Sequence, residues 1–296
     1  NLLLELQQRM NLAILFIADD RPDRQAPAQR LDVVGGLLLV PALAGLLYGL
    51  SNVYAAGGFG RADVLVPGIG GAALLTGFVV WAVRRGGKAL IDVRLFSVRS
   101  VRVSSIALAF VGAALFAGNF LLPLYFQALR NYDPLHAALL LIPQGVGALL
   151  ARFVVARLVH SHGSRLVAFV GFLVMAAATV PFALAGATTS LTVLGVSLFI
   201  RGFGNGVVFI PIMTVAYVDL ARDQMPQASA ITRIVQQLGG AFGTAMVAVV
   251  LTTAATAERP AAGFDAAFWT TIAITLAAAV VSLLLPAREQ EKVQVA

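Results

Sequence analysis

Eight long apolar runs dominate this sequence, and each is long enough to cross a lipid bilayer as a helix. A spanning helix needs about 20 apolar residues (range roughly 17–25), because each residue adds ~1.5 Å and the hydrocarbon core is ~30 Å thick. The runs lie at residues 33–52, 64–83, 103–127, 135–151, 166–185, 191–218, 227–251 and 266–285. We therefore predict an all-α, polytopic membrane protein with about eight transmembrane helices.

Composition excludes the main alternatives to a helical membrane protein. The chain is 59% hydrophobic and 12% charged, whereas a typical soluble domain carries about 25% charged residues. A soluble chain cannot bury that much apolar surface, and the runs lack the alternation typical of membrane β-barrel strands. The net charge of +7 is not accompanied by a basic patch interleaved with aromatic residues. The expected partner is therefore a lipid bilayer and not nucleic acid.

The basic residues between the runs predict an orientation, because Lys and Arg near membrane ends are retained on the cytoplasmic side. The segments before run one, after runs two, four and six, and after run eight together hold sixteen Lys and Arg residues. The intervening segments hold three, which are Arg61, Arg130 and Arg259. Both ends of the eight-helix unit are therefore predicted to be cytoplasmic.

The N-terminal region suggests that the chain is the C-terminal part of a longer protein. Residues 1–18 form an apolar stretch that Glu5 and Arg9 interrupt, so we interpret them as the remnant of a preceding transmembrane helix. Residues 19–32 are polar and contain proline, which is typical of a linker, here a cytoplasmic one. The first residue is Asn1 and not a methionine.

Residue types that carry out catalysis or bind metals are scarce. The chain has no cysteine, three histidines and no pair of carboxylates inside a predicted run. His160 and His162 are two residues apart, a spacing that does not share one face of a helix, and we expect them in a solvated loop. The glycines at 202–206 lie inside an apolar run with no strand before them, so they are not a dinucleotide-binding motif. We predict no enzyme activity, no cofactor and no metal site.

Arg201 is the most informative single residue, because it is the only charged residue deep inside a predicted run. It lies ~18 Å along the helix from the loop near Thr189, close to the middle of a bilayer. Placing a guanidinium there costs ~2.5–3.5 kcal/mol on insertion scales, so its side chain should face a partner, a cavity or water. Asn205 follows one turn later on the same face. Two interpretations stay open: a structural bond to a backbone carbonyl, or a contact with substrate or a gate.

The run at 227–251 carries polar residues along one stripe. At ~100° per residue, one face of the predicted helix holds Ser229, Arg233, Gln236, Gln237, Gly240 and Thr244. Such a stripe either makes hydrogen bonds to another helix or lines an aqueous cavity. We favour the cavity, because Arg233 adds a charge. Asn119 and Gln144 are further candidates for the polar lining.

Small residues and prolines predict local features of the helices. Gly202 and Gly206, like Gly239 and Gly243, have the spacing that lets two membrane helices approach closely, and Gly240 extends the second set. Proline lacks the backbone N–H that a helix interior uses, so it kinks or interrupts a helix. Kinks are therefore expected at four prolines inside the runs, Pro41, Pro123, Pro143 and Pro211.

Four segments resemble the fourteen-helix drug:proton antiporter branch of the major facilitator superfamily. They are FLLPLYFQ at 120–127, PLHAALLLIPQGVGALLA at 134–151, RGFGNGVVFIPIMTVAY at 201–217 and SAITRIVQQLGGAFGT at 229–244. By this resemblance, residues 1–18 match the end of the sixth helix and 33–83 the two additional central helices. Residues 84–101 would then form a basic cytoplasmic loop, 102–286 the C-terminal six-helix bundle and 287–296 a cytoplasmic tail.

The resemblance implies efflux of drugs or other hydrophobic small molecules in exchange for protons, by alternating access in a bacterial plasma membrane. Alternating access needs two bundles that rock around a midplane site, so the missing N-terminal six-helix half would be a partner. The family's proton-binding acids lie mainly in that half, which is consistent with finding no carboxylate in the interior of any predicted run.

The segment at 156–165, ARLVHSHGSR, resembles the family's gating loop. It keeps Leu158, Gly163 and Arg165. It departs from the family pattern at His160, where an Asp is usual, and at Ser161, where a basic residue is usual. The resemblance therefore does not imply a charge-relay gate on this side.

A non-transporting membrane scaffold or subunit is the alternative function. Such a protein would pack against a partner through its glycine-rich helix faces.

The topology can be tested with short reporter tags inserted at Gly57 and Gly86. These positions flank the second run, so a helix that crosses the bilayer must place them on opposite sides. We expect a membrane-impermeant reagent added to intact cells to reach the tag at 57 and not the tag at 86. Equal accessibility of both tags would contradict the prediction.

Overall fold

The structure is a computed structural model that describes residues 32–53, 60–86, 89, 92–186, 189–221, 224–255 and 260–285. The predicted helix remnant at 1–18, the tail at 287–296 and all of the linker at 19–32 except Asp32 lie outside these residues. The residues from Val33 onward belong to one structural unit, and the description below concerns that unit.

Every regular element in the described ranges is helical, which confirms the predicted all-α fold class. Eight segments are long and apolar enough to cross a membrane, if α5 is counted with η3 and α6 with α7. The protein is therefore an integral membrane protein. The elements are α2 (Val33–Ser51), α4 (Ala62–Arg85), η2 (Val93–Ser97), α5 (Arg99–Leu124), η3 (Tyr125–Leu129), α6 (Pro134–Leu140), α7 (Ile142–His162), α8 (Ser164–Ala183), α9 (Leu191–Tyr217), α10 (Met225–Ala254) and α11 (Pro260–Ser282).

The largest difference from the predicted boundaries is at the end of α7. The apolar run was predicted to end at residue 151, but the helix continues to His162, and only Gly163 separates it from α8. The prediction of a solvated loop at 156–165 is therefore wrong, because residues 156–162 are helical. The physical reason is that apolar composition marks contact with lipid and not the end of backbone hydrogen bonding. Exposed Arg152 and Arg157 can extend their heads toward the membrane surface from a helix that continues.

Two of the four prolines coincide with breaks in helical geometry. A turn at Leu141 separates α6 from α7, and Pro143 follows in the first turn of α7, where a missing N–H costs nothing. Pro123 lies at the end of α5, directly before the π-helical turn η3. Pro41 and Pro211 lie inside the continuous helices α2 and α9.

Asp133 fixes the start of α6. Its carboxylate accepts hydrogen bonds from the backbone N–H groups of Leu135 and His136 and contacts the imidazole of His136. This is the arrangement expected of an acidic N-cap residue. The hydrogen bond to the His136 side chain is the main reason why the pKa of the Asp133 carboxyl lies below its usual range.

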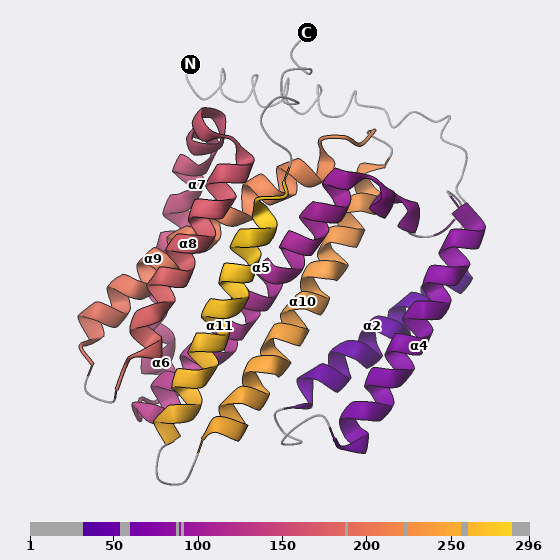
Figure 1. Cartoon of the computed structure of the whole chain (residues 1–296). Helices are drawn as coiled ribbons and strands as arrows, with labels where there is room; N and C mark the ends of the chain where they lie inside the picture. Colours follow the sequence, from indigo (N-terminus) through magenta and orange to yellow (C-terminus); the bar gives the residue numbers. More distant parts are fainter. Residues whose placement is uncertain are drawn as a thin grey trace, which may run out of the picture. The chain divides into compact units, whose positions relative to one another are not determined.

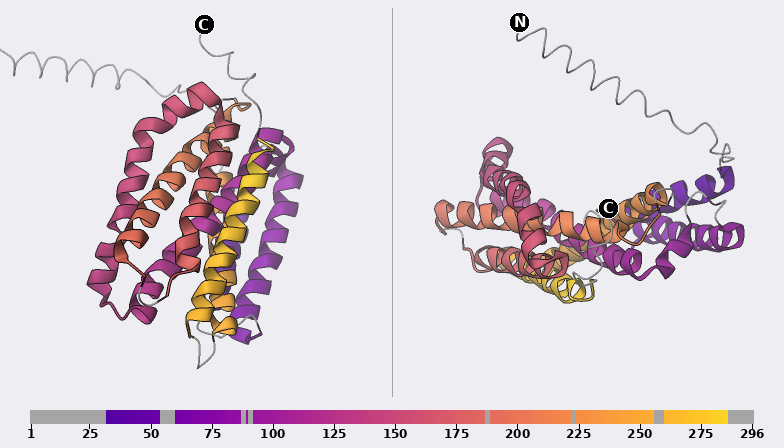
Figure 2. Two further views of the ribbon diagram at one scale, coloured as in Figure 1. Left: turned by 60° about the vertical axis from the view of Figure 1, so that its left-hand side comes forward. Right: turned by 90° about the horizontal axis from the view of Figure 1, so that it is seen from above.

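Helices distant in sequence lie side by side (Figure 1). The most extensive contacts join α5 to α10, α7 to α9, α2 to α4 and α8 to α9, and α11 packs against α8, α5 and α10. The α2–α4 pair reaches the other helices mainly through contacts of α2 with α10, and Figure 2 shows it beside α10, away from α7. The six helices from α5 to α11 that span the membrane therefore share one set of contacts, with α2 and α4 at one edge.

Glycines bring the helix pairs together. A Cβ atom at Gly202 would overlap the backbone carbonyl of Gln144 on α7, and one at Gly239 would overlap the carbonyl of Ala109 on α5. Gly206 and Gly243 lie close to Ala151 and Ala113 on the same two partner helices. In lipid there is no hydrophobic force between helices, so such close contacts contribute much of the attraction. The glycines at both sequence motifs thus lie at contacts within the chain.

Aromatic side chains fill the end of the bundle near η3. Tyr125 and Phe126 are fully buried, and the ring centroid of Tyr125 lies 5.4–5.9 Å from those of Phe126, Phe182, Phe264 and Phe268 in edge-on arrangements. Such edge-to-face pairs are each favourable by about 0.5–1.5 kcal/mol beyond their area. They connect the ends of α5, α8 and α11.

The close α7–α9 contact can be tested by comparing two glycines of α7. A Cβ at Gly147 would overlap the backbone carbonyl of Phe199, whereas a Cβ at Gly145 has no atom within 4 Å. We expect Gly147→Ala to destabilise the protein by ~1–3 kcal/mol, because the backbone must move apart. Gly145→Ala should leave stability unchanged or slightly raised. Thermal unfolding in detergent measures both, and equal midpoints for the two variants would contradict this packing.

Candidate functional site

Arg201 lies in the middle of α9 and is 3% exposed. Its Nη2 donates to the carbonyl of Ala114 on α5 at 3.1 Å, and its Nη1 donates to Oε1 of Gln144 on α7 at 3.2 Å. In the described part of the chain, no carboxylate forms an ion pair with it. Its positive charge is therefore stabilised by hydrogen bonds across three helices. The bond to Ala114 is the backbone-carbonyl contact of the first interpretation, and a contact with substrate or a gate stays a prediction.

Gly118 creates the space that the guanidinium occupies. A Cβ at this position of α5 would overlap the Nη2 and Cζ atoms of Arg201. The close packing of α9 against α5 at this level thus depends on a missing side chain. Sequence reasoning did not single out Gly118, since its partner on another helix becomes apparent only in three dimensions.

Gln144 extends the hydrogen bonding outward from Arg201. Its Oε1 accepts from the guanidinium, and its Nε2 donates to Oδ1 of Asn119 on α5 at 3.4 Å. Solvent exposure increases along this row of hydrogen-bonded side chains, since Arg201 is buried, Gln144 is half-buried and Asn119 is exposed. We call these three residues the polar relay. The charge of Arg201 polarises Gln144, so the relay presents the amide N–H groups of Asn119 at an exposed surface.

The polar stripe of α10 is divided between two environments. Arg233 and Gln237 are exposed, whereas Gln236 is 6% exposed and lies at the contact with α5, where a Cβ at Gly112 would overlap its backbone carbonyl. The expectation that Gln236 shares a surface with Arg233 and Gln237 is therefore wrong. The reason is that α5 approaches α10 closely enough to cover one flank of the stripe.

A pocket of about 250 Å³ lies beside Gln237. Its other lining residues on α10 and α5 are Gly240, Ala241, Thr244 and Phe116, and α2 contributes Leu47, Leu50 and Ser51. The helix α2 thus covers part of the polar stripe, which the sequence did not indicate.

The family follows from comparison of the sequence with known proteins. The family model described as Major Facilitator Superfamily matches residues 31–244, which include every residue of the polar relay and of the α10 stripe. The chain belongs to this superfamily.

Several known proteins are similar to the chain. The "Multidrug resistance protein B homolog" of Mycobacterium tuberculosis (strain ATCC 25618 / H37Rv) is 35% identical over 243 residues, which are 81% of this chain and 44% of that protein. In Bacillus subtilis (strain 168), the "Uncharacterized MFS-type transporter YhcA" is 30% identical, over 75% of the chain and 42% of that relative. The "Uncharacterized MFS-type transporter YcnB" of the same strain is 27% identical, over 89% of the chain and 57% of that relative. The chain thus spans about half the length of these relatives.

The other candidate site residues predicted from the sequence are not part of the polar relay. Asn205 is half-buried on α9, and no described hydrogen bond uses its side chain. His160 and His162 lie in the last turn of α7, and Gly163 forms the connection with φ of 79°. Leu158 is half-buried, and Arg165 is exposed at the start of α8. These gating-segment residues are separate from the polar relay.

Asp265 is a carboxylate that the predicted boundaries placed outside the last run. The helix α11 begins at Pro260, six residues earlier than predicted, so Asp265 lies half-buried in its second turn and inside the spanning segment. The expectation that no span contains an interior carboxylate is therefore wrong. Proline favours the first position of a helix, and Pro260 was the sequence signal that could have extended the prediction.

The geometry around Arg201 predicts that Gly118→Ala displaces the guanidinium from its acceptors. A buried hydrogen bond to a charged group contributes about 1.5–3 kcal/mol, so we expect a loss of stability of this order in a thermal unfolding measurement. Gly195→Ala is a matched control, because a Cβ there has no atom within 4 Å. The cost of Gly118→Ala should shrink in an Arg201→Ala background. A cost that is the same in both backgrounds would show that Gly118 does not act through Arg201.

Proposed function

We propose that the chain is the C-terminal part of a secondary active transporter that exports hydrophobic small molecules, by alternating access and in exchange for protons. In this proposal residues 33–83 are the two central helices and 102–286 the C-terminal bundle. The basic loop at 84–101 and both ends of the unit lie on the cytoplasmic side of a bacterial plasma membrane. An N-terminal six-helix half supplies the opposite wall of the substrate path.

The polar relay is the single observation that carries this proposal. A guanidinium at the middle of a spanning helix is costly, and intramembrane ionisable residues usually serve transport or binding. Here the charge connects through Gln144 to Asn119 at an exposed surface. A purely structural arginine needs no such connection to the outside of the bundle. We infer that Asn119 donates hydrogen bonds to acceptor groups on the substrate, and that Arg201 fixes the orientation of the relay.

The remaining polar candidates extend the proposed path. Arg233 and Gln237 are exposed on α10, and Asn205 is half-buried on α9. These side chains add a few polar groups to an otherwise apolar wall, which is the composition of sites that bind many hydrophobic molecules. Proton exchange rests on the resemblance to the drug:proton antiporter branch. Drug export is also supported by the multidrug-resistance name of the Mycobacterium relative.

The scaffold alternative has less support from the packing. It requires glycine faces that are available to a partner protein. Gly202 and Gly206 instead lie against α7, and Gly239 and Gly243 lie against α5. The two glycine pairs that the sequence offered for such docking are therefore occupied by helices of this chain.

Dye efflux by the full-length protein tests the proposal. In cells without their own drug pumps, Arg201→Lys should reduce efflux about tenfold or more. The reason is that a single ammonium group cannot replace a planar guanidinium that donates to two separate acceptors. Gln144→Leu should have a similar effect, since it interrupts the relay while leaving the charge. The control is Arg152→Gln, which removes an exposed arginine of α7 outside the relay.

Two outcomes would contradict the proposed export and the role of the relay in it. One is a full-length protein that is present in the membrane and exports no dye. The other is wild-type efflux in both relay variants, which would assign Arg201 a structural role only. Addition of an uncoupler, which collapses the proton gradient, should also abolish efflux. Unchanged efflux in the presence of the uncoupler would exclude exchange with protons.

A further inference from the structure

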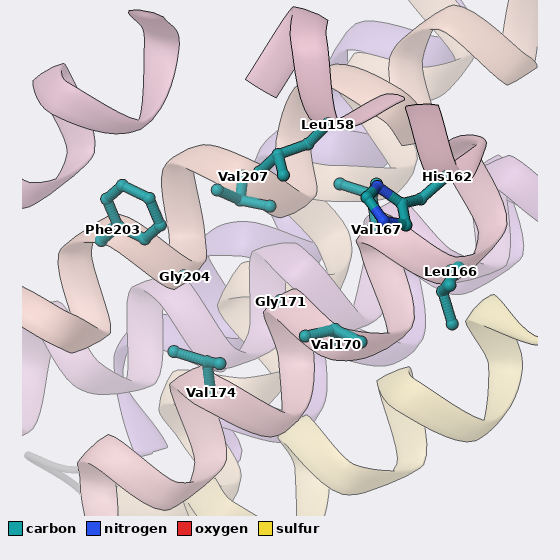
Figure 3. Close-up of a pocket in the computed structure, with 10 residues that line it drawn as sticks. All are labelled: Leu158, His162, Leu166, Val167, Val170, Gly171, Val174, Phe203, Gly204 and Val207. Atoms are coloured by element: carbon teal, nitrogen blue, oxygen red, sulfur yellow. The ribbon is translucent and has the colours of Figure 1, made fainter. Parts of the chain in front are cut away.

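An apolar groove of about 270 Å³ lies between α7 and α8 over α9, and no residue of the polar relay lines it (Figure 3). Two residues of α7, five of α8 and three of α9 form its walls and floor. They are Leu158, His162, Leu166, Val167, Val170, Gly171, Val174, Phe203, Gly204 and Val207. None of them belongs to the proposed substrate path.

The groove results from how the three helices pack. The helix α8 crosses α9 closely where Gly171 faces Gly204, since a Cβ at Gly204 would lie 3.0 Å from the carbonyl of Gly171. The helix α7 approaches the same stretch of α9 from another side, through Gly147 and Gly206. Both helices therefore contact α9 far more than each other, and the space between them stays open.

The walls of the groove suit a hydrocarbon chain. Valine, leucine and phenylalanine side chains line it, and a buried water would need two or more polar partners that these walls do not offer. From Leu166 to Val174 the groove follows α8 for about 12 Å, at ~1.5 Å per residue. It begins next to Gly163, the single residue that joins α7 to α8.

The same end of the groove is positively charged. His162 lines it, and Arg157 and Arg165 are exposed one residue before the lining residues Leu158 and Leu166. No Asp or Glu occurs anywhere from residue 134 to residue 218. The next carboxylate, Asp219, follows Val207 by twelve residues, or ~18 Å along a helix. A negatively charged group at this end of the groove would therefore meet basic side chains, and the described residues of α7, α8 and α9 include no carboxylate that would compete.

We propose that this groove is a binding site for an anionic phospholipid. One acyl chain lies between α7 and α8 on the floor formed by α9, and the phosphate contacts the basic side chains around the α7–α8 connection. A plain apolar surface would accept any lipid, whereas a hydrocarbon groove that ends in basic groups selects the negatively charged ones. The site is a property of this bundle and does not depend on the proposed export function.

Photocrosslinking of the full-length protein in lipid nanodiscs tests this site. The probes are phosphatidylglycerol and phosphatidylcholine that carry the same photoreactive acyl chain, each added as a minor component to phosphatidylcholine discs. Mass spectrometry of the peptides identifies the labelled residues. We expect phosphatidylglycerol to label Val170, Val174 and Phe203 several-fold more than phosphatidylcholine does.

Two variants separate the charge from the groove. The double variant His162→Gln, Arg165→Gln should abolish the preference for phosphatidylglycerol, because it removes basic groups near the phosphate. Arg152→Gln is its control, since it removes an exposed arginine of α7 that does not line the groove. Val170→Phe should reduce labelling by both lipids, because it fills the groove. Its control, Val196→Phe, changes an exposed valine of α9 outside the groove.

Three outcomes would overturn the proposal. The first is equal labelling by the two lipids, as expected of a surface wetted by bulk lipid. The second is a loss of labelling in Val170→Phe that Val196→Phe reproduces. The third is displacement of the phosphatidylglycerol label by an exported dye, which would make the groove a drug site.

Discussion

Close contact between helices at small residues is the constraint on which this structure depends. Apolar side chains gain little by leaving lipid for the interior of a bundle, so dispersion and short polar contacts must hold the helices together. Gly147 and Gly202 bring α7 against α9, and Gly112 and Gly239 bring α5 against α10. The position of each polar group follows from these approaches.

The burial of Arg201 illustrates this dependence. The guanidinium lies deep in the membrane only because Gly118 leaves room for it between α5 and α9. Its two acceptors belong to α5 and α7, so three helices must be in register before the charge is satisfied. The same packing leaves α7 and α8 apart and so creates the apolar groove above α9. The proposed substrate path and the proposed lipid site are thus two consequences of one set of helix contacts.

Much of the fold could be predicted from apolar run length alone. Each of the eight runs overlaps one spanning segment, because the bilayer imposes a minimum helix length on any sequence. Boundaries were less predictable where the helix extends beyond its apolar run. The helix α7 continues eleven residues past its run, and α11 begins six residues before its run and so includes Asp265. Run length records exposure to lipid, and it contains no information on where backbone hydrogen bonding ends.

The candidate site was predictable residue by residue but not as an arrangement. Arg201, Gln144 and Asn119 each stood out in the sequence as polar residues in apolar surroundings, and a helical period placed Gln236 beside Arg233. The sequence alone determined that the chain spans a membrane as helices, because lipid requires every backbone group to be satisfied within its own segment. Only the tertiary structure decided that three of these residues form one relay, and that Gln236 is covered by α5. Both outcomes depend on which helices approach closely, and that choice is made by glycines and their partners on helices distant in sequence.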